Sequence, residues 1–444
     1  MPEPCDTNPE TRLASCWERA FLAERPSLSL GLFRIAVAAT VGLHIFPTFL
    51  QMEDNYLSTA FREYNPLFFT AGVLKWVDGN PDWFVWMMAG VFTVAWLAFL
   101  LGAFTQIAGI VMDVGCYYFY ARNCLHIGTL SYDILLVTVF LMIVTPYPGD
   151  SFSLDALIRG DPEPWRRSRP IFIQRLLQLQ VAATYFCTGL CKWTASGNWL
   201  TDNPYYYLMH SPPEGVIKAF SGRAFLAAHP DLCYAIGIGI ILCEMTLPFW
   251  LFWRRSRPFA IAAGFIFHIL LVVTMHVPTI FLFLFPPLLL LFVEPESLVA
   301  WLERRRERWR LQGPARLIYD GGCGFCRASL ARVQALDPTG RIGPVDFRSV
   351  NAASLNPALT PEACHARIHL LETSGRLSGG FDAFRRLSLC LPMLWPLAPL
   401  LNLPGLGLIG APVYDWVSRN RFNLLHRFHA CEENACVRPD TPVR

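Results

Sequence analysis

Long apolar segments with few charged residues constrain the fold of this chain more than any other feature. A run of about 20 apolar residues is enough for a helix to cross the hydrocarbon core of a bilayer. The apolar segments lie at 28–50, 83–104, 106–120, 130–144, 171–193, 232–253, 259–275 and 279–293. The hydrophobic fraction of 53%, with only 16% charged residues, excludes an ordinary soluble enzyme. We therefore predict an α-helical multi-pass membrane bundle of about eight spans over residues 28–295, preceded by an N-terminal interfacial segment at 1–27.

The basic residues between the apolar segments predict the orientation of the bundle. With eight spans and the N-terminus inside, most arginines fall in the cytoplasmic connections: Arg159, Arg166, Arg167, Arg169, Arg254, Arg255, Arg257 and the cluster at 304–310. The outer connections carry only Arg62, Lys75, Arg122, Lys218 and Arg223. Because cytoplasmic loops are enriched in Lys and Arg, we expect a protein of the cell membrane with both the N-terminus and the C-terminal domain in the cytoplasm. The net charge of +3 is too small to indicate a nucleic-acid partner.

A second constrained stretch follows the basic linker at 296–313. A short β-favouring run, 317–319, is broken by Asp320-Gly-Gly, and a helical pattern begins directly afterwards. Cys323 and Cys326 therefore lie on a strand-to-helix turn, with Cys323 at the helix N-terminus. The unpaired N–H groups and the positive end of the helix dipole favour a thiolate at that position. Two intervening residues allow the second thiol to attack a mixed disulfide formed by the first.

Two other interpretations of these cysteines are half of a zinc site and a pair of inert buried thiols. A zinc ribbon needs a second pair of ligands, and Cys431 and Cys436 have the wrong spacing for a standard one. We therefore expect a redox-active dithiol and no metal. Cys431 and Cys436 are candidates for a resolving or relay pair.

The segment that begins Asp320-Gly-Gly-Cys323-Gly-Phe-Cys326 resembles the DCC family of thiol-disulfide oxidoreductases, whose signature is DxxCxxC. The resemblance continues through 344–348, 379–384, Tyr414 and 421–422, and so covers a domain at 314–437 with a tail at 438–444. It implies an α/β thioredoxin-like fold with Asp320, Cys323 and Cys326 as site residues. Cys323 would be the attacking thiolate and Cys326 the resolving thiol, with a thiol or disulfide protein, or a small thiol, as partner.

Ionisable residues within the apolar segments are costly, by roughly 2.5–3.5 kcal/mol each on insertion scales, so each needs a partner or a purpose. They are Arg34, Asp113, Asp133, Arg175, Lys192, Glu244 and His268. The segment 171–193 is the most polar and is expected to line a cavity inside the bundle. Lys192 is either an interfacial anchor or a catalytic amine. His268 is either a hydrogen-bonded core histidine or a catalytic group.

The segment 185–199, with Gly189 and Lys192, is similar to the YFxxGxxKL…W segment of the horizontally transferred transmembrane (HTTM) domain family, which includes the vitamin K-dependent γ-glutamyl carboxylase. The similarity extends over about 20–295. It implies that Lys192 is a base, because a lysine desolvated in an apolar pocket loses its proton more readily. It also implies that Lys192, His126, His268 and Arg34 contact a ligand such as a quinone; no other cofactor is indicated.

The rest of the C-terminal domain has two further features. A strand is predicted at 366–372, with Cys364, His365 and His369 around it as ordinary residues. The apolar, proline-rich run at 389–412 is either a helical insert or a monotopic contact with the membrane, since its prolines prevent a span.

Two functions fit these features. The first is a membrane-bound thiol-disulfide oxidoreductase coupled to a carboxylase-like bundle that binds a quinone or another lipid-like ligand. The second is an HTTM-type enzyme or carrier for a lipid-like or peptide substrate, with the thiol domain as a redox sensor. A scaffold with a vestigial dithiol is the remaining alternative.

Overall fold

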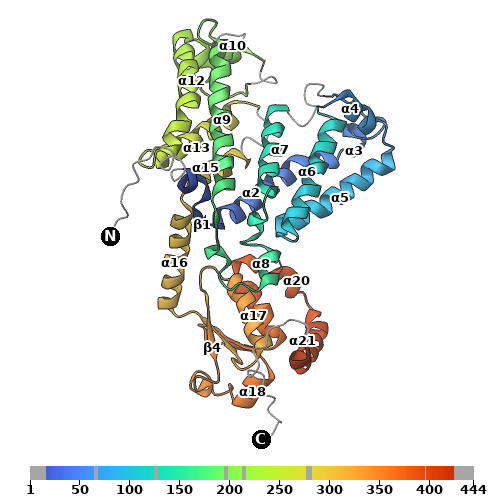
Figure 1. The fold of residues 1–444 in the computed structure, drawn as a ribbon, viewed down its shortest axis with the longest axis vertical. Helices are drawn as coiled ribbons and strands as arrows, with labels where there is room; N and C mark the ends of the chain where they lie inside the picture. The colour runs from blue at the N-terminus through green and yellow to red at the C-terminus, as the bar shows by residue number, and fades with distance from the viewer. Residues whose placement is uncertain are drawn as a thin grey trace. The chain divides into compact units, whose positions relative to one another are not determined.

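The structure is a computed structural model that describes residues 17–64, 69–124, 129–194, 199–212, 217–276, 283–395 and 397–424. The chain divides into two compact units (Figure 1). Unit 1 comprises Met1–Ser153 and Ser168–Pro295, and unit 2 comprises Leu154–Arg167 and Glu296–Arg444. The connection 154–167, which the sequence analysis assigned to the transmembrane segment, therefore clusters with the C-terminal unit.

Unit 1 is built from long apolar helices joined by short ones. The long helices are α2 (Leu28–Phe49), α5 (Asp82–Leu101), α6 (Thr105–Arg122), α7 (Thr129–Ile143), α9 (Phe172–Thr194), α12 (Pro230–Phe252) and α13 (Arg257–Thr274). The short elements are η1 (Glu18–Leu22), α3 (Met52–Asn55), α4 (Ala71–Asp78), η2 (Tyr147–Gly149), α10 (Pro204–His210), α11 (Arg223–Ala227) and α15 (Phe285–Leu290). Strands β1 (Glu24–Pro26) and β2 (Ser168–Pro170) pair antiparallel.

Four helices in the described part of the chain are long and apolar enough to cross a membrane, so the prediction of eight spans is not confirmed. They are α2, α5, α12 and α13. Helix α7 is shorter, with an apolar stretch at Ile134–Ile143. Polar side chains such as Gln174, Arg175 and Gln178 lower the hydropathy of α9. Of the predicted span at 279–293, the described part contains only the six-residue helix α15, and residues 277–282 lie outside the described residues.

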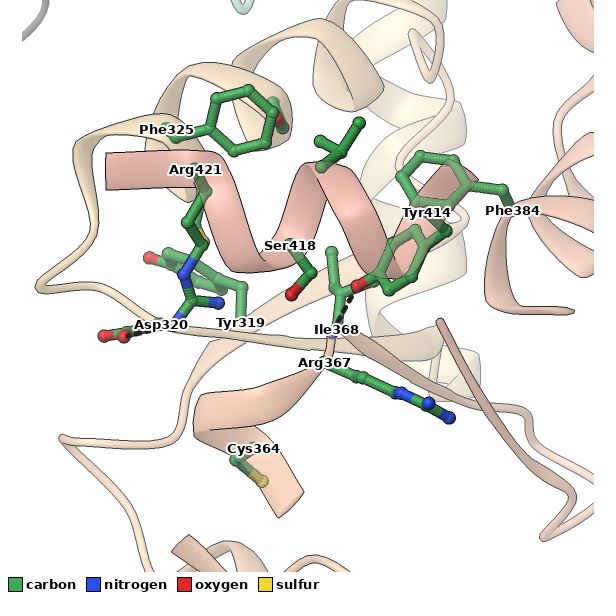
Figure 2. A pocket seen from close by; sticks show the side chains of 13 residues that line it. Tyr319, Asp320, Phe325, Cys364, Arg367, Ile368, Phe384, Tyr414, Ser418 and Arg421 are labelled. Atoms are coloured by element: carbon green, nitrogen blue, oxygen red, sulfur yellow. Dashed lines mark hydrogen bonds and ion pairs between the residues drawn. The ribbon is translucent and has the colours of Figure 1, made fainter. Parts of the chain in front are cut away.

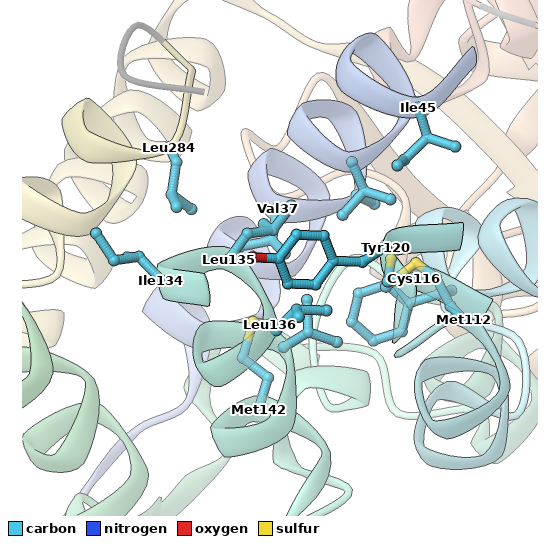
Figure 3. Close-up of a cluster of buried hydrophobic side chains, with 14 of the residues drawn as sticks. Val37, Ile45, Met112, Cys116, Tyr120, Ile134, Leu135, Leu136, Met142 and Leu284 are labelled. Atoms are coloured by element: carbon cyan, nitrogen blue, oxygen red, sulfur yellow. The ribbon is translucent and has the colours of Figure 1, made fainter. Parts of the chain in front are cut away.

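Helix α2 lies in the core of unit 1, because 72% of its most apolar window is buried. Figure 3 shows Val37 of α2 near Leu135 of α7 and Tyr120 of α6, and Ile45 of α2 belongs to the same buried cluster. The indole N–H of Trp96 on α5 donates to the carbonyl of Ala38 at 2.7 Å. The core of unit 1 therefore combines apolar packing with a side-chain hydrogen bond between α5 and α2.

Helices α9 and α12 pack more extensively than any other pair of elements in the described chain. Gly189 makes their close approach possible, because a Cβ atom there would lie 2.7 Å from Met245 Cγ and 3.1 Å from Glu244 Cβ. The same crossing places Lys192, one helical turn after Gly189, beside Glu244. The glycine thus positions a buried ion pair.

Unit 2 contains a four-stranded mixed sheet in the order β4-β3-β5-β6. Strand β3 runs parallel to β4 and antiparallel to β5, and β5 is antiparallel to β6. The strands are β3 (Ala315–Tyr319), β4 (Ile342–Asp346), β5 (His369–Leu371) and β6 (Leu377–Gly379). The helices are α8 (Leu154–Arg159), η3 (Pro164–Arg166), α16 (Pro295–Gln312), α17 (Gly324–Ala335), η4 (Ala352–Ser354), α18 (Pro361–Ala366), α19 (Phe381–Cys390), η5 (Pro392–Leu394), α20 (Ala398–Leu401) and α21 (Leu406–Leu424).

The two faces of the sheet in unit 2 bury separate clusters, as the alternation of side chains along a strand requires. Leu317 packs with Leu330 of α17 and Leu387 of α19 on one face. Ile318 packs with Leu359 and Cys364 on the other. Cys364 and His365 lie in helix α18, so the strand predicted at 366–372 is shorter than expected and begins at His369.

Candidate functional site

The two cysteines of the CxxC motif lie at the N-terminus of α17, directly after β3 and the turn Asp320–Gly322. Cys323 is the N-cap residue, and its sulfur accepts a hydrogen bond from the backbone N–H of Cys326 at 3.4 Å. The strand, the turn and the helix start all agree with the sequence prediction. Gly321 is required in this turn because a Cβ atom there would lie 2.1 Å from Asp346 Oδ2.

The environment of the two thiols makes them unequal. A hydrogen bond from the Cys326 thiol, with smaller contributions from the Cys326 backbone N–H and the charge of Arg421, lowers the pKa of Cys323 to about 6 against the effect of burial. The same hydrogen bond, together with burial, raises the pKa of Cys326. At neutral pH the pair therefore holds a thiolate at Cys323 and a protonated thiol at Cys326, which is the asymmetry that dithiol exchange uses.

Asp320 anchors a cluster of basic groups beside the dithiol. Its carboxylate is only 2% exposed and accepts hydrogen bonds from Arg348 Nε at 2.6 Å and from the Gly322 N–H at 3.0 Å. His365 Nδ1 lies 3.4 Å away and Arg421 3.8 Å away. Burial alone would raise the pKa of Asp320, but the hydrogen bonds and charges of these partners outweigh it and lower that pKa. Asp320 thus stays ionised and orients its neighbours instead of taking up a proton.

Helix α21 forms one wall of a cavity of about 50 Å³ that reaches Cys326 (Figure 2). Three side chains on its inner face bond to the segment before β5. The Tyr414 hydroxyl accepts from the Ile368 N–H at 3.0 Å, Ser418 donates to the Ala366 carbonyl at 2.7 Å, and Arg421 donates to the His365 carbonyl at 2.7 Å. Cys326 lines the cavity, whereas the side chain of Cys323 has no exposed surface. Such a cavity admits water but not a peptide.

A second candidate site is a cavity of about 250 Å³ inside the helical bundle. Lys192 Nζ lies 2.9 and 2.7 Å from the two carboxylate oxygens of Glu244, a geometry in which both oxygens accept from one ammonium. The Tyr185 hydroxyl lies 2.6 Å from His268 Nε2. The remaining lining is mainly apolar, with residues such as Ile134, Ile240, Phe267, Leu271 and Phe285. Two polar pairs in an apolar chamber are typical of a site for a small lipid-soluble ligand.

The other residues expected at this cavity are placed differently. Arg34 is fully buried and donates to the carbonyls of Pro148 at 3.2 Å and Phe152 at 2.5 Å, and it is not among the residues that line the cavity. Its contacts are those of a residue that fixes the turn after α7. His126, Cys431 and Cys436 lie outside the described residues. Within the described part of the chain, no group of three or more His, Cys, Asp and Glu side chains is arranged to hold a metal ion.

The sequence analysis does not predict several residues that the structure places at the dithiol or at the bundle cavity. Glu244 was noted only as a costly charge; its pairing with Lys192 is the expected solution for two opposite charges in apolar spans. Arg348, Tyr414 and Arg421 all fall in the stretches that carry the DCC-family resemblance, and that resemblance is the signal for them. The sequence predicts only an ordinary role for His365, and no sequence signal places it beside Asp320.

Comparison with known protein families assigns both units. An HTTM domain model matches residues 23–296, more than half of the 444-residue chain, and a DCC1-like thiol-disulfide oxidoreductase model matches residues 317–427. Searches of curated proteins and of solved structures found no significant match. The chain is a membrane protein of the HTTM family that carries a DCC1-like thiol-disulfide oxidoreductase domain after its membrane domain.

Proposed function

We propose that unit 2 is a thioredoxin-like oxidoreductase that exchanges its dithiol with a disulfide partner. The observation that carries this proposal is the unequal pair of thiols at the N-terminus of α17. The Cys323 thiolate attacks one sulfur of the partner's disulfide, and the partner's other sulfur leaves as a thiolate that takes up a proton. Cys326 then loses its proton and attacks Cys323, which releases the reduced partner. Two electrons pass to the partner, and a second thiol donor, protein or small, reduces the Cys323–Cys326 disulfide again.

Because the side chain of Cys323 has no exposed surface, attack on a protein disulfide requires part of its own domain to move. Helix α21 lines the cavity beside Cys326 and is our candidate for that movement. It is bonded to 365–368 by individual hydrogen bonds and one ion pair, Arg367 with Asp415 at 3.2 Å, and it also packs on α19 and α17. A small disulfide would need less opening than a folded protein.

We place the dithiol domain on the cytoplasmic side of the cell membrane. The distribution of arginines supports this, and so does the grouping of 154–167 with 296–444 in one unit. Arg166 pairs with Glu303 at 2.9 Å, and Arg306 pairs with Glu163. Both segments then lie on one side of the membrane, which requires an even number of crossings between Ser168 and Pro295. We propose that α9, α12 and α13 supply three of these crossings and that the apolar segment predicted at 279–293 supplies the fourth.

A redox titration of the full-length protein in membranes tests the exchange function. Membranes are equilibrated with thiol–disulfide buffers of rising oxidising strength, and free cysteines are counted by alkylation and mass spectrometry. We expect one cooperative loss of two alkylated sites, Cys323 and Cys326, while the buried Cys364 stays reduced. A Cys364→Ser variant should behave like the parent. A Cys323–Cys326 pair that remains reduced at every potential would contradict the proposal.

We propose as a linked second activity that the bundle binds a quinone-like or other lipid-soluble ligand in the cavity beside Lys192. This proposal rests on the two polar pairs that line the cavity, Lys192 with Glu244 and Tyr185 with His268. The Lys192 ammonium can donate to a ligand oxygen, and Tyr185 or His268 can donate to a second one. When bound, a quinone would supply the capacity to accept two electrons and two protons. Glu244 is a proton acceptor for Lys192, so a proton can move between them when Lys192 acts as a base. Arg34, which bonds to the carbonyls of Pro148 and Phe152, is not used in this scheme, and His126 lies outside the described residues.

Filling the cavity should abolish ligand binding. Thr188 lines the cavity, and its hydroxyl bonds only to carbonyls of its own helix in the contacts that the structure describes. We expect the Thr188→Phe variant to lose the quinone that co-purifies with, or is titrated into, the parent protein. Thr246→Phe is the matched control, because Thr246 bonds its own helix in the same way but is exposed and outside the cavity. Equal quinone content in all three proteins would refute the assignment.

A further inference from the structure

The outward side of α21 carries an apolar stripe that the core of unit 2 does not use. At 100° per residue its members fall on one face of the helix. They are Leu408, Ile409, Val413 and Trp416, which are 82%, 67%, 56% and 59% exposed. The opposite face, with Tyr414, Ser418 and Arg421, closes the cavity at Cys326. A surface helix of a soluble domain usually exposes its polar face, whereas α21 exposes its apolar stripe and turns polar side chains inward.

The chain before this stripe extends the same character. Trp395, Leu397, Leu400 and Leu403 are each about half exposed, at 54%, 50%, 56% and 49%. No charged residue occurs between Arg386 and Asp415. A continuous exposed apolar surface of this kind marks a contact with another protein or with a membrane. Protein-binding surfaces usually carry a polar rim, and a stretch this long without any charge is instead suited to lipid.

Unit 2 is also covalently tethered close to the bilayer. Three covalent connections, at 153–154, 167–168 and 295–296, join unit 2 to unit 1, which carries the membrane-crossing helices. Such tethering keeps the effective concentration of the membrane surface high, so even a modest apolar contact is populated. Trp395 and Trp416 have the amphipathic ring that favours the membrane–water interface. The prolines and short helices of 389–412 exclude a further span.

We propose that the apolar stripe of α21, with the preceding turn of α20, lies in the headgroup–acyl boundary of the bilayer as a monotopic contact. This proposal does not depend on dithiol exchange or on the bundle's ligand. It has one consequence for the dithiol: the helix that walls off Cys326 is held by lipid on its other side.

Photo-crosslinking with lipids tests the contact in the full-length protein. The chain is reconstituted in phosphatidylcholine–phosphatidylglycerol vesicles that contain a phospholipid with a diazirine in its acyl chain. After irradiation, lipid adducts are mapped by mass spectrometry. We expect adducts on peptides from 397–416, as on the membrane helix α5, and none at Val350. Val350 is the matched control, since it is an apolar residue of unit 2 that is 44% exposed.

A variant with Leu408→Glu and Val413→Glu should lose the adducts on 397–416 and keep those on α5. Both side chains point outward, so the fold tolerates them, and an unchanged Cys323–Cys326 titration verifies this. Labelled α5 peptides without labelled 397–416 peptides would overturn the proposal. So would protein–protein crosslinks through Trp416 in place of lipid adducts, because they would identify a second copy or another protein as the occupant.

Discussion

Replacing Glu244 with glutamine is expected to lower the free energy of unfolding of the bundle by about 3 kcal/mol. The side chain of Glu244 is 8% exposed and that of Lys192 is 25% exposed, and both oxygens of the carboxylate bind the ammonium. The substitution leaves the Lys192 ammonium without a compensating charge in a mostly apolar cavity. We place the loss at the low end of the range for buried pairs because Lys192 is partly exposed. The measurement is the melting temperature in detergent, followed by intrinsic fluorescence.

The same reasoning predicts the outcome of a double-variant cycle. Lys192→Met leaves the Glu244 carboxylate alone and should destabilise the bundle to a similar degree. The double variant Lys192→Met/Glu244→Gln removes both charges and should regain most of the stability, since breaking a pair costs far more than replacing it. The ion pair does not form if each single variant has a free energy of unfolding within about 0.5 kcal/mol of the parent's. The same conclusion follows if the double variant loses as much stability as the two single variants together.

Replacing Cys326 with alanine is expected to shift the titration of Cys323 strongly. With a pKa of about 6, Cys323 is roughly nine-tenths thiolate at pH 7. The largest cause of that low pKa is the hydrogen bond from the Cys326 thiol, so Cys326→Ala should raise the pKa toward the ordinary value of a thiol. The thiolate fraction at pH 7 then falls by about tenfold or more. Thiolate absorbance in the far ultraviolet, measured against a Cys323→Ser protein, reports the titration.

Cys326→Ser is the matched control for this titration, because its hydroxyl can still donate to the Cys323 sulfur. It should keep the Cys323 pKa nearer to 6 than Cys326→Ala does. The direction follows from the thiolate being the hydrogen-bonded form: losing the donor destabilises the anion, and deprotonation moves to higher pH. Identical titration midpoints in the alanine variant and the parent would mean that the helix N-terminus and Arg421, not Cys326, hold the thiolate.

Local features of the dithiol segment were accessible from the sequence. The run 317–319, the Asp-Gly-Gly break and the helical pattern after Cys326 each act within a few residues, and the structure has β3, a turn and α17 in those places. The apolar segments likewise predicted where helices α2, α5, α12 and α13 lie. Hydrophobicity and local turn chemistry are sufficient for such features.

Features that depend on contacts between distant segments were not accessible. Nothing in the local sequence pairs Lys192 with Glu244, because the pairing depends on how α9 and α12 cross at Gly189. His365 lies in α18, and its Nδ1 comes within 3.4 Å of Asp320 through the packing of segments that are distant in the sequence. The grouping of 154–167 with unit 2 depends on contacts between segments over a hundred residues apart, among them the ion pair of Arg166 with Glu303.

Trapping of a mixed disulfide tests the central claim most directly. The Cys326→Ser variant is expressed in its native membrane, quenched with acid and analysed by non-reducing electrophoresis and mass spectrometry. Cys323 can still attack a partner in this variant, but no second thiol is present to resolve the mixed disulfide. We therefore predict a discrete protein or small thiol linked to Cys323. A Cys323→Ser/Cys326→Ser control should show no such adduct. A Cys323 that stays free in the variant, or a partner captured by Cys326 in a Cys323→Ser protein instead, would contradict the account of Cys323 as the attacking thiolate.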